Sequence, residues 1–193
     1  FYLFWISLAI GAAAGMITGL LMQIFDQDVV LSGKALGFNA FTSLLGGATI
    51  SVLSQMGFFA YLIVRYMVGG MFRKKWIWNY IQIVLMLIVI FDLVYLRFAN
   101  ADNPGALGSY LILPLVMIAV GVAIAWYKVK LTNPSAWIPT LFFMIFVSAL
   151  EAIPSIRENN PASTIFMMTP LLACNAWQIL VLHKVLDANK EPQ

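Results

Sequence analysis

The sequence predicts an all-α polytopic integral membrane protein, with six transmembrane helices packed in one compact bundle. Hydrophobic residues make up 62% of its 193 residues and charged residues only 10%, whereas about a quarter of the residues of a soluble domain are charged. The charges gather in short segments between long apolar stretches, and a helix of about 20 residues crosses the hydrocarbon core of a bilayer. The sequence is therefore interpreted as a single transmembrane domain over 1–193.

The apolar stretches place the six helices. The first run is about twice as long as the apolar core of a secretion signal, so we interpret it as a helix that stays in the membrane. The chain opens at Phe1 without an initiator Met, and we expect a few residues to precede it. The run over 35–64 exceeds what a bilayer requires, and either tilt or an interfacial start over 35–42 would absorb the excess. The predicted helices cover about 1–25, 42–66, 76–97, 107–127, 136–154 and 162–184.

The distribution of Lys and Arg predicts the orientation. Positive charges in short loops are retained on the cytoplasmic side of a membrane. Eight basic residues follow the second, fourth and sixth helices, among them Arg65, Lys128 and Lys184, and only three lie at the opposite ends. Tryptophans such as Trp126 and Trp137 fall at the same boundaries, where their rings favour the interface. We therefore expect a cell-membrane protein with both termini in the cytoplasm.

Small residues on the first two helices predict a packing face. Gly11, Gly15 and Gly19 recur every four residues, and Gly47 and Ser51 share a stripe on the second helix. Small residues let membrane helices approach closely, because lipid gives apolar side chains no net drive to associate. We expect these faces to pack within one chain, and a homodimer seam is the alternative.

Amides within the predicted spans form a second group of candidate residues. Each needs a hydrogen-bond partner, because the bilayer core offers no water. They are Gln55, Asn79, Gln82, Asn175 and Gln178. Two interpretations stay open: hydrogen bonds that join helices, and the lining of a functional cavity.

Two carboxylates, Asp92 and Glu151, are predicted at similar depth in the outer third of the membrane. An ionised carboxylate there is costly, so it should be paired, hydrated or protonated. Arg97 and Arg157 lie five and six residues further along the chain and can reach back towards these carboxylates. Glu151 also shares a face with Ser148. The four charged residues would form either a structural cluster or an outward-facing polar pocket that senses a ligand, a proton or a partner helix.

No enzyme motif is visible in the sequence. It lacks the zinc motif HExxH, a phosphate-binding P-loop and a GxSxG elbow, and it has one cysteine, Cys174, and one histidine, His183. We therefore predict no catalytic residue, no metal site and no cofactor. The net charge of +3 is spread over the loops, which argues against nucleic acid as a partner. A regulator and a small transporter or lipid- or ligand-binding membrane protein remain as alternatives.

Several segments together resemble the KbaA family of KinB-signalling pathway activation proteins, known from spore-forming Bacillales. The segments are SQMGFFAYL (54–62), WNYIQIV (78–84), FDLVY (91–95), KLTN (130–133), IPTLFFM (138–144) and PLLACNAWQ (170–178). The resemblance implies a non-enzymatic bacterial membrane protein that activates a KinB-like membrane sensor histidine kinase in the sporulation phosphorelay.

The resemblance also implies membrane lipids and the kinase as partners, and it supplies no catalytic residue. The positions that match its motifs are Gln55, Asn79, Gln82, Asp92, Asn175 and Gln178. We expect helix contacts to carry the activation, through either the glycine face of the first helix or the small polar stripe of the second.

Overall fold

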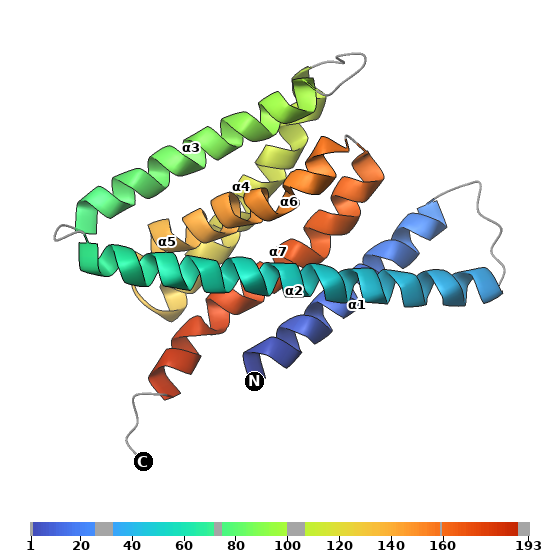
Figure 1. The fold of residues 1–193 in the computed structure, drawn as a ribbon, viewed down its shortest axis with the longest axis horizontal. Helices are drawn as coiled ribbons and strands as arrows, with labels where there is room; N and C mark the ends of the chain where they lie inside the picture. The colour runs from blue at the N-terminus through green and yellow to red at the C-terminus, as the bar shows by residue number, and fades with distance from the viewer. Residues whose placement is uncertain (1, 26–32, 72–74, 100–106, 159, 189–193) are drawn as a thin grey trace.

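The structure, a computed structural model, describes residues 2–25, 33–71, 75–99, 107–158 and 160–188. All regular elements in these ranges are helical, and six of the helical segments are long and apolar enough to cross a membrane. The long helix α2 runs across the other helices of the bundle (Figure 1). The beginning of α1 and the end of α7 lie towards the same side of the molecule (Figure 1).

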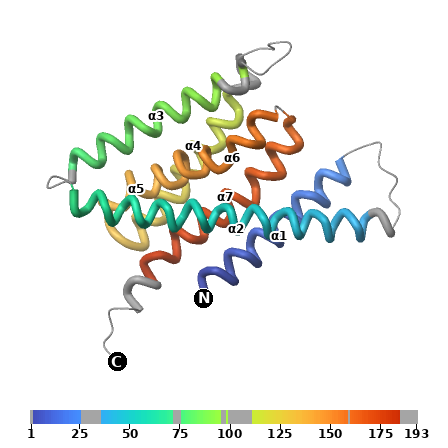
Figure 2. The backbone as a smooth tube through the Cα atoms, in the orientation of Figure 1, coloured from blue at the N-terminus to red at the C-terminus, as the bar shows by residue number. Residues whose placement is uncertain are grey.

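Helix α2 (Gly33–Met71) is much longer than the sequence predicted. It has 39 residues, or about 58 Å at 1.5 Å per residue, and it continues as one uninterrupted rod (Figure 2). It begins nine residues before the expected start at 42. The Asn39 side chain donates a hydrogen bond to Gln23 Oε1 over 2.8 Å, which fastens this early part of α2 to the end of α1 (Tyr2–Phe25).

Helix α3 (Lys75–Ala99) lies at the edge of the bundle (Figure 1). It packs against α4 (Leu107–Leu131) and against the fifth span. The remaining sides of α3 are open, and many of its large apolar side chains are exposed. In a membrane these side chains would face lipid or another protein.

The fifth span consists of four consecutive pieces. A short 3₁₀ turn, η1 (Pro134–Ala136), precedes α5 (Trp137–Phe142), the π-helical turn η2 (Phe143–Val147) and α6 (Ser148–Arg157). A π turn adds a residue to the helical repeat and rotates the next helical segment about its axis. Three consecutive side chains of η2 are therefore buried, and α6 still turns Ser148 and Glu151 into the bundle. The last helix, α7, covers Pro161–Ala188.

The apolar core lies between the second half of α2, the inner face of α3, the fifth span, α4 and α7. The rings of Phe58 and Phe143 meet edge to face with centroids 5.6 Å apart, and Tyr61 packs on Phe143 at 5.1 Å. Met117 and Leu171 are completely buried beside them. This core joins helices that also carry most of the buried polar side chains.

Helix α1 joins the bundle through its small residues. A Cβ atom added to Gly15 would lie 2.5 Å from the Cα of Gly47, and one added to Gly11 would lie 2.5 Å from the Cβ of Ser51. Gly19 faces Ser43 in the same way. The residues predicted as a packing face thus bring the backbones of α1 and α2 together inside one chain.

Candidate functional site

A network of buried polar side chains connects four helices near the middle of the bundle. Ser7, Ser54, Ser148, Asn175 and Gln178 have no exposed surface, and Glu151 is only 9% exposed. They come from α1 (Ser7), α2 (Ser54), α6 (Ser148 and Glu151) and α7 (Asn175 and Gln178). Residues from both ends of the chain therefore meet at one site.

Asn175 is the centre of the network. Its amide nitrogen donates to Ser148 Oγ over 2.8 Å and to Glu151 Oε2 over 3.0 Å. Its carbonyl oxygen accepts from Ser54 Oγ over 2.7 Å. One side chain on α7 thus fixes the rotation of both α2 and α6, because each bond has a limited range of distance and angle.

Gln178 extends the network to α1 one turn further along α7. Its oxygen lies 3.4 Å from Ser54 Oγ, and its nitrogen donates to Ser7 Oγ over 3.4 Å. The Cys174 thiol donates to the carbonyl oxygen of Ser7, also over 3.4 Å. These longer bonds are weaker than those of Asn175, but they complete the link between α1 and α7.

The second carboxylate oxygen of Glu151 has no hydrogen-bond partner among the described residues. It rests against Gly57 on α2, at the position that a Cβ atom of a larger residue would occupy. The absence of a side chain at Gly57 therefore makes room for the Glu151 carboxyl group. A buried ionisable group within a span is expensive, and such groups often mark functional positions.

Of the other predicted amides, Gln55 borders this network, and Asn79 and Gln82 lie on α3. Gln55 donates weakly to the Phe4 carbonyl oxygen and to Ser51 Oγ, both over 3.4 Å. Gln82 is completely buried on α3, and neither of its polar atoms has a partner in the part of the chain that the structure describes. Asn79 is half-buried on α3 and faces a hollow beside Ser135.

The structure does not gather the four charged residues into one buried cluster. Glu151 points into the bundle, whereas Asp92 is exposed on α3 and Arg157 is exposed at the end of α6. The side chain of Arg97 lies outside the described residues. The two carboxylates thus have different surroundings: Glu151 is bound by the Asn175 amide, and Asp92 lies on the exposed surface of α3.

The chemistry of the network is hydrogen bonding between helices. Hydroxyls and amides surround a single carboxyl group, and such networks favour one packing of a bundle over its alternatives. In membranes each bond contributes about 0.6 kcal/mol on average. The network can therefore hold α1, α2, α6 and α7 in one arrangement, or distinguish that arrangement from a second one.

The sequence alone did not place Ser7 in this site. A signal was present, because Ser7 lies four residues before Gly11 and continues the spacing of Gly11, Gly15 and Gly19. Such a small residue is typical of a packing face, and only the structure shows that its hydroxyl meets Gln178.

Comparison with known proteins identifies the family. The family model KbaA, described as KinB-signalling pathway activation in sporulation, matches residues 11–185. The chain belongs to the KbaA family. The match contains Ser54, Glu151, Asn175 and Gln178, and it confirms the resemblance found in the sequence.

A curated relative agrees with this assignment. The KinB-signaling pathway activation protein of Bacillus subtilis strain 168 is 38% identical over 139 residues, which cover 72% of this chain and 70% of that protein. No solved structure matches this chain.

Proposed function

We propose that this KbaA-family protein is a non-enzymatic regulator in the bacterial cell membrane that activates a KinB-like sensor histidine kinase. Its output would enter the phosphorelay that starts sporulation. The family description and the name of the Bacillus subtilis relative support this proposal. The six apolar helices are compatible with a membrane location.

The proposed orientation has both termini in the cytoplasm. Six spans would return the chain to the side on which it started. Arg65, Lys128 and His183, from α2, α4 and α7, line one cavity, so basic residues far apart in the sequence share one end of the bundle. Such an end belongs on the cytoplasmic side by the distribution of positive charge.

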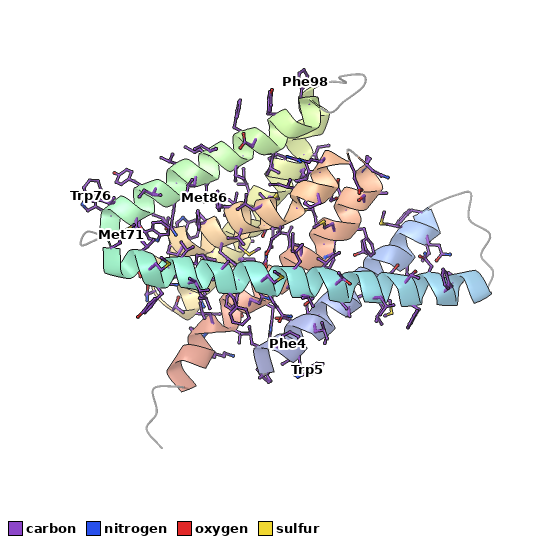
Figure 3. All side chains as sticks on the ribbon, viewed as in Figure 1. Phe4, Trp5, Met71, Trp76, Met86 and Phe98 are labelled. Carbon is purple, nitrogen blue, oxygen red and sulfur yellow. The ribbon has the colours of Figure 1, made fainter. Side chains whose placement is uncertain are left out.

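We propose that the exposed face of α3 contacts the transmembrane helices of the kinase. Trp76 projects outward from the first turn of α3 (Figure 3), and it begins a stripe that recurs every three or four residues and therefore follows one face. The side chains of the stripe are between 53% and 68% exposed: Trp76, Tyr80, Val84, Leu87, Phe91 and Tyr95. The rings of Phe91 and Tyr95 stack with centroids 6.2 Å apart.

The proposal rests mainly on Asp92, because Asp92 is an exposed carboxylate beside an apolar stripe. Asp92 directly follows Phe91 and lies four residues after Ile88, which is 50% exposed. A carboxylate that faces lipid is costly, and polar residues within spans commonly find partners on other helices. A transmembrane helix with a hydrogen-bond donor or a cation at this depth would satisfy Asp92.

The two surfaces that the sequence favoured for the kinase are occupied within the chain. The glycine face of α1 contacts the stripe of α2 that carries Gly47 and Ser51. A kinase helix could reach either face only after α1 and α2 had separated. We therefore place the contact on α3 instead.

Activation requires different affinities for two states of the kinase. A partner shifts a two-state equilibrium only by its difference in affinity for the two states. We propose that the network around Asn175 holds α2, α6 and α7 in place, so that α3, which packs on the fifth span, presents its face in a constant geometry. The active arrangement of the kinase helices would fit this face better than the inactive one.

The experiment is complementation of a deletion strain in the host of this gene, with a reporter of KinB-like kinase output. Asp92→Leu should lower the output by about threefold to twentyfold, since one interhelical hydrogen bond contributes about 0.6 kcal/mol on average and at most about 1.7 kcal/mol. Asp92→Asn removes the charge but keeps one acceptor oxygen, so it should lower the output by a smaller factor. Glu158→Gln is the matched control, because Glu158 is an exposed carboxylate next to the last turn of α6. Its output should remain within twofold of wild type.

Protein levels in the membrane must be equal in these strains, since a poorly inserted variant would also lose output. Full kinase output in the deletion strain would refute the proposed function. Normal output from both Asp92 variants would refute the contact on α3 and leave the activating function in place.

A further inference from the structure

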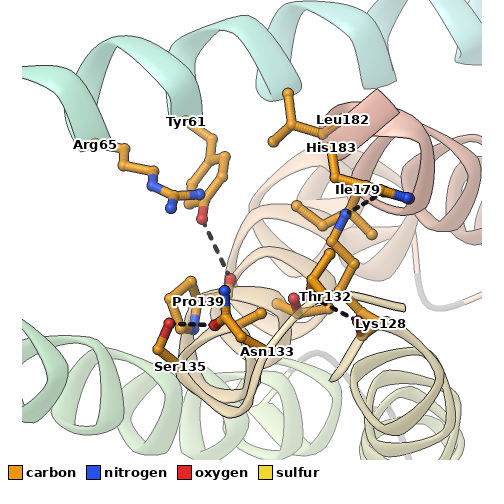
Figure 4. A pocket seen from close by; sticks show the side chains of 12 residues that line it. Tyr61, Arg65, Lys128, Thr132, Asn133, Ser135, Pro139, Ile179, Leu182 and His183 are labelled. Carbon is orange, nitrogen blue, oxygen red and sulfur yellow. Dashed lines mark hydrogen bonds between the residues drawn. The ribbon is translucent and has the colours of Figure 1, made fainter. Parts of the chain in front are cut away.

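A cavity at the basic end of the bundle combines three basic side chains from three helices. It encloses about 200 Å³, and Figure 4 shows Arg65 from α2, Lys128 from α4 and His183 from α7 around it. Tyr61, Thr132 and Ser135 add hydroxyl groups to its wall. None of the described residues that line it is acidic.

Lys128 is the unusual member of this group. The residue is only 6% exposed, although lysine is almost never fully buried without a partner. Its ammonium lies 3.2 Å from the carbonyl oxygen of Leu180 and 3.2 Å from Nδ1 of His183. An ammonium has three N–H donors, so these two neighbours leave at least one donor for another acceptor.

His183 offers Lys128 no negative charge. Its Nδ1 is also only 2.6 Å from the carbonyl oxygen of Leu180, so the imidazole and the ammonium converge on the same backbone oxygen. Because a carbonyl oxygen only accepts, Nδ1 donates to it and does not accept from Lys128, and the one neutral oxygen that the two side chains share compensates a buried positive charge only in part. The cavity therefore concentrates positive charge that its described walls do not neutralise.

Arg65 provides the second fixed charge and lies on the more open side of the cavity. It is exposed, and its guanidinium lies beside the ring of Tyr61 (Figure 4). The Tyr61 hydroxyl is 3.4 Å from the carbonyl oxygen of Pro139, which holds the ring against the start of α5. A guanidinium presents a planar fork of donors that suits phosphate oxygens.

We propose that this cavity binds a phosphate group, with the ammonium of Lys128 and the guanidinium of Arg65 as its cationic ligands. Two sources share this chemistry: the headgroup of an anionic phospholipid and soluble phosphate. Basic pockets between transmembrane helices on the cytoplasmic side are typical sites for anionic headgroups.

The size and position of the cavity fit such a group. Its volume of about 200 Å³ equals that of about seven water molecules of roughly 30 Å³ each, and a phosphate has five heavy atoms. Trp126 lies two residues before Lys128, and the ammonium of Lys130 lies 3.5 Å from the centre of the Trp126 ring. A tryptophan with a lysine over its ring is typical of the level at which lipid headgroups begin.

The test measures binding to the purified full chain in neutral detergent, by native mass spectrometry and by thermal stability. The probes are phosphatidylglycerol, phosphatidylcholine as the zwitterionic comparison, and inorganic phosphate. The variants are Arg65→Gln and Lys128→Met, with Lys130→Gln as the control that removes a neighbouring charge outside the cavity. Because Arg65 is exposed, Arg65→Gln keeps the test valid if Lys128→Met fails to fold.

A lipid headgroup site predicts that wild type binds phosphatidylglycerol at least tenfold more tightly than phosphatidylcholine. Arg65→Gln should weaken that binding by about tenfold, since it removes a charge-assisted contact, and Lys130→Gln should change it by less than threefold. A soluble phosphate site predicts instead that inorganic phosphate stabilises wild type and not Arg65→Gln, with no preference between the lipids. If neither phosphatidylglycerol nor phosphate distinguishes wild type from Arg65→Gln, the proposal is overturned.

Discussion

Replacing Asn175 with alanine removes the centre of the polar network. The change deletes three hydrogen bonds of 2.7–3.0 Å, with Ser54, Ser148 and Glu151. At about 0.6 kcal/mol for each bond in a membrane protein, the bonds themselves account for about 2 kcal/mol. Buried groups left without partners add about 1 kcal/mol or more. We therefore expect Asn175→Ala to lower the free energy of unfolding by about 3 kcal/mol.

The assay is unfolding of the purified protein in mixed micelles by titration with a denaturing detergent, followed by circular dichroism. Thr169→Ala is the matched control, because Thr169 lies on the same helix, is exposed and, among the described residues, bonds only to the backbone of Ile165. It should change the free energy of unfolding by less than about 0.5 kcal/mol. Wild-type stability of Asn175→Ala would refute the structural role of the network.

A double-mutant cycle separates the hydrogen bond from the cavity that alanine leaves. Ser54→Ala and Asn175→Ala share the shortest bond of the network. Their effects should be non-additive by about 0.6 kcal/mol, and by no more than about 1.7 kcal/mol, the range measured for such pairs in membranes. Strict additivity would show that Ser54 and Asn175 contribute independently, which contradicts the geometry.

Three further substitutions test other parts of the packing. Gly15→Ala places a Cβ atom 2.5 Å from the backbone of Gly47 and should lower the free energy of unfolding by about 1–3 kcal/mol. Gly69→Ala is the matched control: no described residue lies within 4 Å of its added Cβ, so it should be neutral or slightly stabilising. Equal stabilities of the two variants would count against the close approach of α1 and α2. Gly57→Ala should displace the Glu151 carboxyl group that rests there and lower the free energy of unfolding in the same assay. The double variant with Glu151→Ala should recover part of that loss. If it recovers none, Gly57 matters for another reason. Gln82→Met should leave stability unchanged or raise it by about 1 kcal/mol, because both polar atoms of this buried side chain lack partners among the described residues. A clear loss of stability in the micelle titration would reveal a partner for Gln82.

The long apolar helices could be predicted because helices of this kind carry a strong local signal. An uninterrupted apolar stretch identifies a span without any knowledge of its neighbours, and the six predicted helices correspond to six long apolar segments. The length of α2 was not predictable in this way. Its first turns depend on the bond from Asn39 to Gln23, a contact between two helices that hydropathy does not report.

The members of the polar site were visible in the sequence, but their partners were not. Asn175 and Gln178 stood out as amides within an apolar helix, and Glu151 as a carboxylate in another. Which of them meet depends on the rotation of each helix about its axis. The π turn at Phe143–Val147 changes that rotation for Ser148 and Glu151, and such a turn has no sequence signature of its own.

The two carboxylates also show that the sequence does not determine which way a side chain points. Counting residues placed Asp92 and Glu151 at similar depth, but depth does not determine which way a side chain points. Glu151 turns inward to Asn175, whereas Asp92 is exposed on α3. A grouping by depth alone therefore combined a residue of the core with a residue of the surface.

Site-specific photo-crosslinking in native membranes tests the proposed contact with the kinase most directly. A photoreactive amino acid at Leu87 stands within the exposed stripe of α3, where the side chain is 63% exposed. The control position is Ile17 on α1, which is 55% exposed. We expect Leu87 to yield an adduct with the KinB-like kinase and Ile17 to yield none. An adduct only with a second copy of this chain, or a kinase adduct from Ile17 and none from Leu87, would contradict activation through α3.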